Sequence, residues 1–264
     1  MLGSLWAFRG FVISSIRREF QARYRNSLLG ALWTVLNPLA MILVYTLVFS
    51  QLMRSRLPGV DNHLAYGFYL CAGFLVWGLF TEITGRSQSM FLDNANLIKK
   101  LSFPRICLPT VVIGTALINF AITFVLFLLI ISVAGAFPGP ALLALPPLLL
   151  IMLAFAAGLG MLLGVLNVFF RDVGQLFGIV VQFWFWLTPI VYPIEILPSY
   201  IRPLVEINPM TPLVGAFQAV LVYQRWPDWT SLWSPLLIAI LLCGIGLLLF
   251  RARSVSYTHL RAHE

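Results

Sequence analysis

Uncharged apolar runs, separated by short charged segments, make up most of this sequence. Five stretches contain no Asp, Glu, Lys or Arg: residues 26–53, 62–81, 106–170, 173–194 and 229–250. An α-helix rises 1.5 Å per residue, so about 20 apolar residues are needed to cross a hydrocarbon core of about 30 Å. The pattern therefore predicts membrane-spanning helices.

The longest run, residues 106–170, has room for two crossings, and the sequence GAFPGP at residues 135–140 is typical of a turn between them. Six spans are therefore predicted, at residues 29–52, 62–84, 107–134, 141–169, 173–193 and 229–250. We interpret the chain as an all-α integral membrane protein with a single transmembrane domain, residues 1–253.

A helix with one apolar face is predicted before the first span, over residues 1–25. Apolar side chains recur there every three or four residues, at Leu5, Phe8, Val12, Ile16, Phe20 and Tyr24. The charged residues Arg9, Arg17, Arg18 and Glu19 lie off that stripe. Such a helix is too charged to cross a bilayer, so we expect it to lie in the membrane interface with its apolar face toward the lipid.

The connection between spans five and six differs from the others in composition. It carries seven prolines within residues 189–227 and an uncharged piece at residues 207–224. A seventh span there would move Arg251 and Arg253 to the outside. We therefore expect re-entrant helices in this external loop, which persist at membrane depth only where protein buries them or water lines them.

The charge balance adds orientation to this picture. The chain is 60% hydrophobic and only 10% charged, with a net charge of +8. If six spans leave both ends inside, 13 of the 17 Lys and Arg residues fall on the cytoplasmic side. The positive charge thus indicates a multi-pass protein with both termini cytoplasmic, and not a nucleic-acid-binding protein.

Two polar pairs interrupt the apolar helices. Asn37 and Pro38 lie within the first span, where the proline is expected to kink the helix as a packing feature or as a hinge. Glu82 and Arg86 are spaced i and i+4 near the end of the second span. This spacing favours an ion pair, either structural or part of a gate.

Aromatic residues gather at the end of the fifth span. Phe183, Trp184, Phe185, Trp186 and Tyr192 form either an interfacial aromatic belt or a surface on which sugar rings stack. We place Trp33 with Phe183, Trp184, Trp186 and Tyr192 as candidate channel aromatics.

Signatures of catalysis are missing from the sequence. There is no GxxxxGK[ST], HExxH or GxSxG motif, and the cysteines Cys71, Cys107 and Cys243 form no CxxC pair. No catalytic residue, metal site or cofactor is therefore predicted in this chain. Residues 254–264, which hold two of the three histidines, are interpreted as a non-native tail.

Five motifs in this order resemble one family: RYRNSLLGALWTVLNPL, NANLIKKLSFPR, NVFFRDV, LTPIVYP and INPMTPLV. They are similar to the membrane-spanning subunit of polysaccharide ABC exporters, most closely the O-antigen (Wzm-type) group. The resemblance implies a homodimer in the bacterial inner membrane that works with separate ATPase subunits, which hold the ATP and Mg²⁺. The cargo would be lipid-linked polysaccharide, moved from cytoplasm to periplasm.

The resemblance also implies roles for residues of this chain. Arg17, Arg18, Arg23 and Arg25 would receive the lipid pyrophosphate, and Pro209 and Pro212 would belong to an outer gate. The contacts with the ATPase would come from Asn94, Asn96, Lys99, Lys100, Arg171 and Asp172. Three alternatives stay open: a capsule or teichoic-acid exporter, an exporter of a drug or small lipid, and a membrane-embedded lipid-modifying enzyme.

Overall fold

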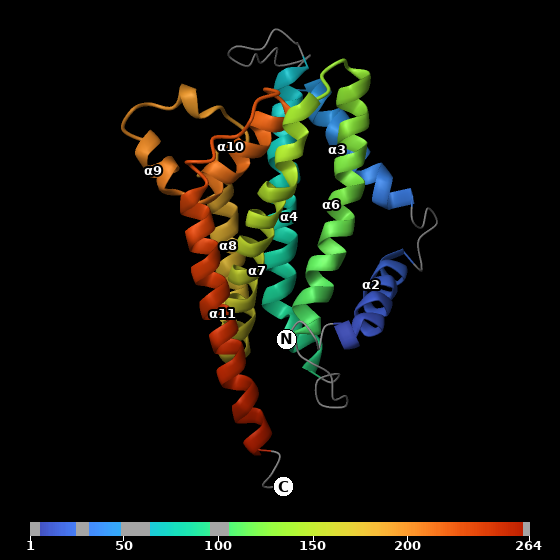
Figure 1. Ribbon diagram of the computed structural model, residues 1–264, viewed down its shortest axis with the longest axis vertical. Helices are drawn as coiled ribbons and strands as arrows, with labels where there is room; N and C mark the ends of the chain where they lie inside the picture. The colour runs from blue at the N-terminus through green and yellow to red at the C-terminus, as the bar shows by residue number, and fades with distance from the viewer. Residues whose placement is uncertain (1–5, 25–31, 49–63, 96–105, 261–264) are drawn as a thin grey trace.

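The computed structural model describes residues 6–24, 32–48, 64–95 and 106–260, with helical backbone alone at residues 23, 24 and 250–260. Within these ranges the chain is helical and contains no strand, which confirms the predicted all-α class. The long helices run side by side in Figure 1: α4 (Ala65–Asp93), α6 (Cys107–Val133), α7 (Leu145–Phe169), α8 (Asp172–Trp186) and α11 (Trp233–Leu260).

Shorter elements lie at the two ends of this bundle. Helix α2 (Arg9–Tyr24) lies beside one end of α6, and α3 (Trp33–Leu47) packs on α4 and α6. The opposite end carries the short helices η3 (Gly139–Ala144), η4 (Ile194–Ile196), α9 (Arg202–Ile207) and α10 (Met210–Leu221) (Figure 1).

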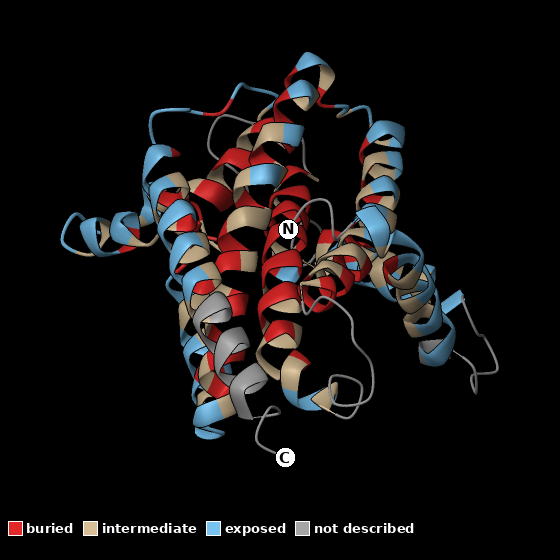
Figure 2. Cartoon of the chain, turned by 60° about the horizontal axis from the view of Figure 1, so that its bottom comes forward, coloured by how far each residue is buried: buried red, intermediate tan, exposed pale blue. Residues whose placement is uncertain are grey.

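Helix α4 is the centre of the core. It packs against α3, α6, α7 and α10, and its buried residues are spread along its whole length (Figure 2). Leu70, Phe80 and Ile83 are completely buried. Helix α10 is also buried, with Leu213, Val214 and Phe217 in the same core. The connection between α8 and α11, predicted to be external, thus packs a helix against α4 and α7.

Glycines of α7 allow its backbone to lie directly against the backbones of neighbouring helices. A Cβ on Gly164 would lie 2.6 Å from the Ser87 carbonyl oxygen of α4, and one on Gly158 would lie 2.7 Å from the Cys243 nitrogen of α11. Gly160 faces Ser87 as well, one helical turn from Gly164. Two glycines four residues apart therefore bring α7 and α4 together along the lower part of α4, a packing mode common among membrane helices.

The turn predicted at residues 135–140 is confirmed. Helix α6 ends at Val133, and Gly135 and Gly139 take positive φ values of 72° and 62°. This left-handed backbone conformation is easily adopted by glycine alone, so these two residues allow the chain to reverse between α6 and α7.

Three helix ends differ from the predicted ranges. Helix α4 runs on to Asp93, beyond the expected residue 84, because Ser87 and Met90 are buried and extend its packed face. Helix α8 stops at Trp186 instead of residue 193, since Pro189 has no backbone N–H to continue it. Helix α11 begins at Trp233, after a turn in which Asp228 accepts hydrogen bonds from Thr230. These hydrogen bonds hold the pKa of Asp228 below its usual value.

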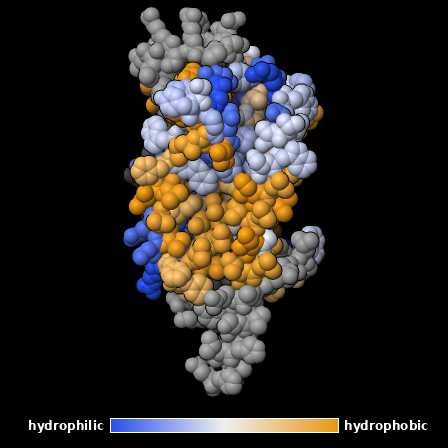
Figure 3. Space-filling model, turned by 90° about the vertical axis from the view of Figure 1, so that its left-hand side faces the viewer, coloured by the Kyte–Doolittle hydropathy of each residue, from blue (hydrophilic) through white to orange (hydrophobic). Residues whose placement is uncertain are grey.

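Several helices are suited to a bilayer by length and composition. Ala65–Asp93, Cys107–Val133 and Gly139–Phe169 are long and apolar enough to cross one, and Trp33–Leu47, Met210–Leu221 and Trp233–Leu249 are shorter apolar helices. Figure 3 shows an apolar band across the face that carries α8 and α11, with polar side chains above it. Exposed leucines such as Leu176, Leu237 and Leu248 come from these two helices.

Candidate functional site

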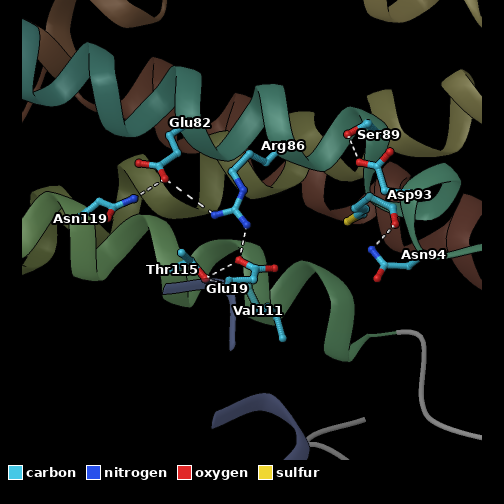
Figure 4. Close-up of polar contacts among 10 residues, drawn as sticks. Glu19, Glu82, Arg86, Ser89, Asp93, Asn94, Val111, Thr115 and Asn119 are labelled. Carbon is cyan, nitrogen blue, oxygen red and sulfur yellow. Dashed lines mark hydrogen bonds and ion pairs between the residues drawn. The ribbon is translucent and has the colours of Figure 1, made fainter. Parts of the chain in front are cut away.

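A cluster of polar side chains joins α2, α4 and α6 inside the otherwise apolar bundle (Figure 4). Arg86 of α4 donates a hydrogen bond to Glu19 of α2, and its second terminal nitrogen lies 3.7 Å from Glu82, one turn earlier on α4. The Asn119 side-chain amide of α6 donates to Glu82. The ion pair predicted between Glu82 and Arg86 is therefore present, as part of a larger network.

The network contains more negative than positive charge. Two carboxylates, Glu19 and Glu82, share one guanidinium, and all three side chains are between 23% and 38% exposed. A carboxylate within a membrane segment costs about 2.5–3.5 kcal/mol when it has no partner. Each carboxylate is stabilised here by Arg86 and by a second polar group, the Asn119 amide or the Thr115 hydroxyl.

Glu19 is the residue of this network that the sequence interpretation missed. The helical stripe placed Glu19 with the exposed arginines, whereas it faces the bundle and contacts α4 and α6. A signal was present: Glu19 is the only acidic residue among residues 1–60, and it lies three positions after Ile16 of the apolar stripe. The apolar face of α2 also has a protein partner, since Val12 packs with Cys107 and Val111 of α6.

The arginines of α2 lie on its other side. Arg17 and Arg18 are exposed, and the Arg18 guanidinium donates to the Ser15 hydroxyl at 3.0 Å. Arg23 belongs to α2 by its backbone, and Arg25 lies outside the described residues. Arg17 makes no ion pair with any described residue. The guanidinium groups of Arg17 and Arg18 are thus exposed, and their contact with an anionic headgroup stays a prediction.

The turn between α7 and α8 carries a second group of predicted residues. Arg171 and Asp172 are exposed there, and Asn94 at the end of α4 donates to the Met90 carbonyl of its own helix at 2.9 Å. The positions of Asn96, Lys99 and Lys100 lie outside the described residues. The ATPase-contacting role assigned to this set is not tested by the described geometry.

Asn167 anchors this turn and was not singled out from the sequence. Its side-chain NH₂ donates to the Gln88 carbonyl of α4 at 2.8 Å, and its Oδ1 accepts from the Gly174 N–H at 3.2 Å. The side chain is buried, with 6% exposure. The start of α8 is thereby connected through α7 to the far end of α4.

The candidate channel aromatics divide into two groups. Phe183 and Trp186 are exposed, at 66% and 61%, and Trp33 is 40% exposed. Trp184 instead points into the core, where it packs on Trp77, Phe80 and Phe155. Its indole N–H donates to Asn208 at 2.7 Å. Tyr192 is half-buried, and its hydroxyl donates to the Trp186 carbonyl at 2.8 Å.

Asn208 ties the external loop to the end of α8. Besides accepting from Trp184, it donates to the Leu187 carbonyl at 3.1 Å and to the Thr188 hydroxyl at 2.9 Å. Its Oδ1 also accepts from the Met210 N–H, at the beginning of α10. Pro209 and Pro212 are half-buried next to it, in the first turn of α10, where proline is tolerated. Their predicted role in a gate is untested.

A cavity of about 290 Å³ lies beside the proline of α3. Asn37 and Pro38 line it from α3, and Glu82 and Asn119 contribute polar groups from α4 and α6. The predicted kink residues thus border the same space as the ion-pair network. Across the described residues, no three His, Cys, Asp or Glu side chains gather as metal ligands would.

The profile of one protein family matches residues 11–222, from α2 to the end of α10, under the description ABC-2 type transporter. The match includes the network around Arg86, the α7–α8 turn and the external loop. The chain belongs to the ABC-2 type transporter family.

Relatives of this ABC-2 transporter chain support the assignment. It is 33% identical, over 96% of both chains, to the O-antigen export system permease protein RfbA of Myxococcus xanthus. It is 28% identical to a protein of the same name from Klebsiella pneumoniae, over 75% of this chain and 74% of the relative. The polysialic acid transport protein KpsM of Escherichia coli is 22% identical, over 89% and 90% of the two chains.

Membership of the ABC-2 family decides the class of protein. The chain is a multi-pass membrane subunit of a transporter, and the family works with an ATPase partner. The alternative of a lipid-modifying enzyme is thereby set aside. The cargo, the subunit number and the orientation in the membrane are questions for a proposal.

Proposed function

We propose that this chain is the membrane-spanning subunit of an ATP-driven exporter that moves lipid-linked O-antigen polysaccharide from the cytoplasm to the periplasm. The observation that carries the proposal is the 33% identity over 96% of both chains with the O-antigen export permease of Myxococcus xanthus. An identity that extends over 96% of both chains covers nearly all of the protein, not only a shared fold core.

The finer architecture belongs to the same proposal. Six spans with both termini in the cytoplasm fit the 13 of 17 basic residues that this topology places on the cytoplasmic side. The inner membrane and a homodimer around the transport path are what the resemblance to polysaccharide exporters implies. The external loop contributes α9 and the buried helix α10 as re-entrant elements, since α10 packs against α4 and α7. ATP and Mg²⁺ would be bound by the separate ATPase, because the sequence has no phosphate-binding loop.

One other cargo has a specific observation in its favour. The polysialic acid transport protein KpsM aligns over 89% of this chain, which makes a capsular polysaccharide the second candidate. The lower identity, 22% against 33%, places it behind O-antigen. No comparable observation favours a drug, a small lipid or teichoic acid.

Complementation separates the two cargoes. The chain and its cognate ATPase are expressed in one strain that lacks its O-antigen export permease, and in another that lacks its capsule export permease. We expect surface O-antigen to return in the first strain only, measured by immunolabelling of whole cells. The ATPase alone is the control. Recovery of capsule without recovery of O-antigen would reverse the assignment.

A further inference from the structure

Helix α2 is attached to the bundle at two points of different chemistry. One point is apolar: Ile16 of α2 lies over Gly114 of α6, and a Cβ on Gly114 would come within 2.6 Å of the Ile16 Cδ1. The other is polar and lies one turn further along α2, where Glu19 meets Arg86 and Thr115. Figure 4 shows Glu19 between the side chains of α4 and α6.

The apolar point aligns α2 but does not by itself bind it strongly. Val12 and Ile16 contact Cys107, Val111 and Gly114, and Phe8 and Phe11 pack against the same cluster as half-buried side chains. Val12 is the one buried side chain in the described part of α2. A helix of 16 residues with so few buried side chains has little tertiary packing to keep it in place. The polar point therefore decides how firmly α2 is held.

Arg86 matters more to Glu19 than to Glu82. Glu82 keeps a hydrogen bond from Asn119 that does not involve Arg86. Among the described residues, Glu19 has the Thr115 hydroxyl as its one partner besides Arg86. That hydroxyl has one proton for two acceptors, Glu19 at 3.0 Å and the Val111 carbonyl at 2.9 Å. Without Arg86, Glu19 would be a half-buried carboxylate whose remaining donor, the Thr115 hydroxyl, also donates to the Val111 carbonyl.

Arg86 itself is incompletely satisfied in this arrangement. Its Nη1 is buried and makes no hydrogen bond within the described ranges, although it lies 3.7 Å from Glu82. A guanidinium can serve two carboxylates through its separate N–H groups. Arg86 thus donates to Glu19 through Nη2, and its Nη1 lies beside the Glu82 carboxylate of the same helix.

We propose that Arg86 is a positioning residue, whose pairing with Glu19 holds α2 on the bundle with Arg17 and Arg18 turned outward to receive a lipid phosphate. The last part rests on the proposed export function. Successive residues of an α-helix are about 100° apart, so when Glu19 faces α4, Arg17 points to the opposite side and Arg18 to the flank of α2. Both are exposed. Arg86 therefore sets the direction of the arginines without touching the cargo.

Cys107 provides a native probe of this attachment. Its side chain is completely buried beneath Val12 of α2, at the beginning of α6. In the purified complex with Cys71→Ala and Cys243→Ala, Cys107 is the only thiol of this chain. Its modification by N-ethylmaleimide, followed on this subunit by mass spectrometry, reports whether α2 has left. We expect Glu19→Gln or Arg86→Gln to accelerate this modification about tenfold, the loss of one charged hydrogen bond.

Two comparisons make the test specific. A variant that keeps only Cys71, which is buried between α4 and α3, should react at an unchanged rate when Arg86 is replaced. The exchanged pair Glu19→Arg with Arg86→Glu should restore protection of Cys107, whereas each single reversal should abolish it. Unchanged Cys107 reactivity in both neutral variants overturns the proposal. Equal acceleration at Cys71 and Cys107 also overturns it, because the bundle as a whole would then have loosened.

The export readout is kept separate from the labelling readout. Surface O-antigen should fall in the single charge reversals and recover in the exchanged pair. If Cys107 responds as expected while no variant, including the wild type, exports O-antigen, the cargo assignment fails and the positioning role of Arg86 stands. If export recovers in the exchanged pair without any change at Cys107, the positioning role is wrong.

Discussion

Asn167 joins the α7–α8 turn to the backbone of Gln88 on α4, with its side-chain amide donating at 2.8 Å. The same side chain accepts from the Gly174 N–H, so one buried amide bridges two helices and the turn between them. A force applied at Arg171 or Asp172 is therefore transmitted to α4 as well as to α8.

Replacing Asn167 by Ala should uncouple that turn. The Gln88 carbonyl and the Gly174 N–H would lose their partner, at a cost of about 1–3 kcal/mol for buried groups. We expect the complex with the ATPase to assemble, and polysaccharide-dependent ATP hydrolysis to fall severalfold. The measurement is ATPase activity in proteoliposomes with and without substrate. Thr84→Ala is the control, because the buried Thr84 hydroxyl bonds only within its own helix, to the Phe80 carbonyl. Equal losses in the two variants would contradict the prediction.

The close contact of α7 with α4 should make Gly164 intolerant of a side chain. Gly164→Ala places a Cβ about 2.6 Å from the Ser87 carbonyl oxygen, which forces the helices apart. We expect a loss of about 1–3 kcal/mol, seen as a lower melting temperature in detergent. Gly85→Ala is the matched control on α4, since nothing lies within 4 Å of its Cβ position. A melting temperature as high as that of the control would contradict the prediction, because the α7–α4 interface would then accept the added methyl group without loss of stability.

The six-span topology predicts which positions face the cytoplasm. Single cysteines are placed at Arg17, Ser199 and Arg253 in a background without Cys71, Cys107 and Cys243. An impermeant maleimide on intact spheroplasts should label position 199 alone, because 13 of the 17 basic residues orient the other two inward. Labelling at position 253 would require an odd number of spans. Permeabilised cells provide the positive control for all three positions.

The basic residues near the α4–α6 connection and the α7–α8 turn are expected to contact the ATPase. A triple variant with Lys99, Lys100 and Arg171 changed to Gln should be present at normal abundance but export poorly. Less ATPase should also co-purify with it, because the interface loses three positive charges. Arg202→Gln, in the predicted external loop, is the control, because it makes the same type of substitution away from the predicted ATPase contact. Normal substrate-coupled ATPase activity in the triple variant would refute the assigned contact.

Arginine and lysine should differ at the α2 surface if a pyrophosphate binds there. Replacing Arg17, Arg18, Arg23 and Arg25 together by Lys preserves the charge, about 1 kcal/mol of headgroup attraction per residue, but removes the bidentate guanidinium. We expect normal insertion with export reduced severalfold. Surface polysaccharide and subunit abundance are measured together. Full export at normal abundance means that these arginines serve topology alone, which needs only their charge.

Features formed by residues close together in the sequence could be predicted, because they depend on local spacing. The i, i+4 pair of Glu82 and Arg86 and the glycine turn at residues 135–140 are of this kind. The apolar runs indicated the helical class, since their length relates directly to the thickness of a bilayer. The five ordered motifs pointed to the family that the ABC-2 profile then matched.

Contacts between helices needed the tertiary structure. Glu19 and Arg86 are 67 residues apart, and Asn167 and Gln88 are 79 apart, so no spacing rule connects them. Helices α6 and α7 are apolar apart from a few residues such as Thr115, Asn119 and Asn167, and the sequence does not say which neighbour these residues meet. The inward direction of Trp184 among exposed aromatics was hidden for the same reason. Sequence alone determined that these segments are helices for a membrane; only packing, through the close approach of Gly164 to Ser87 and of Ile16 to Gly114, decided how each helix is rotated and which polar groups meet.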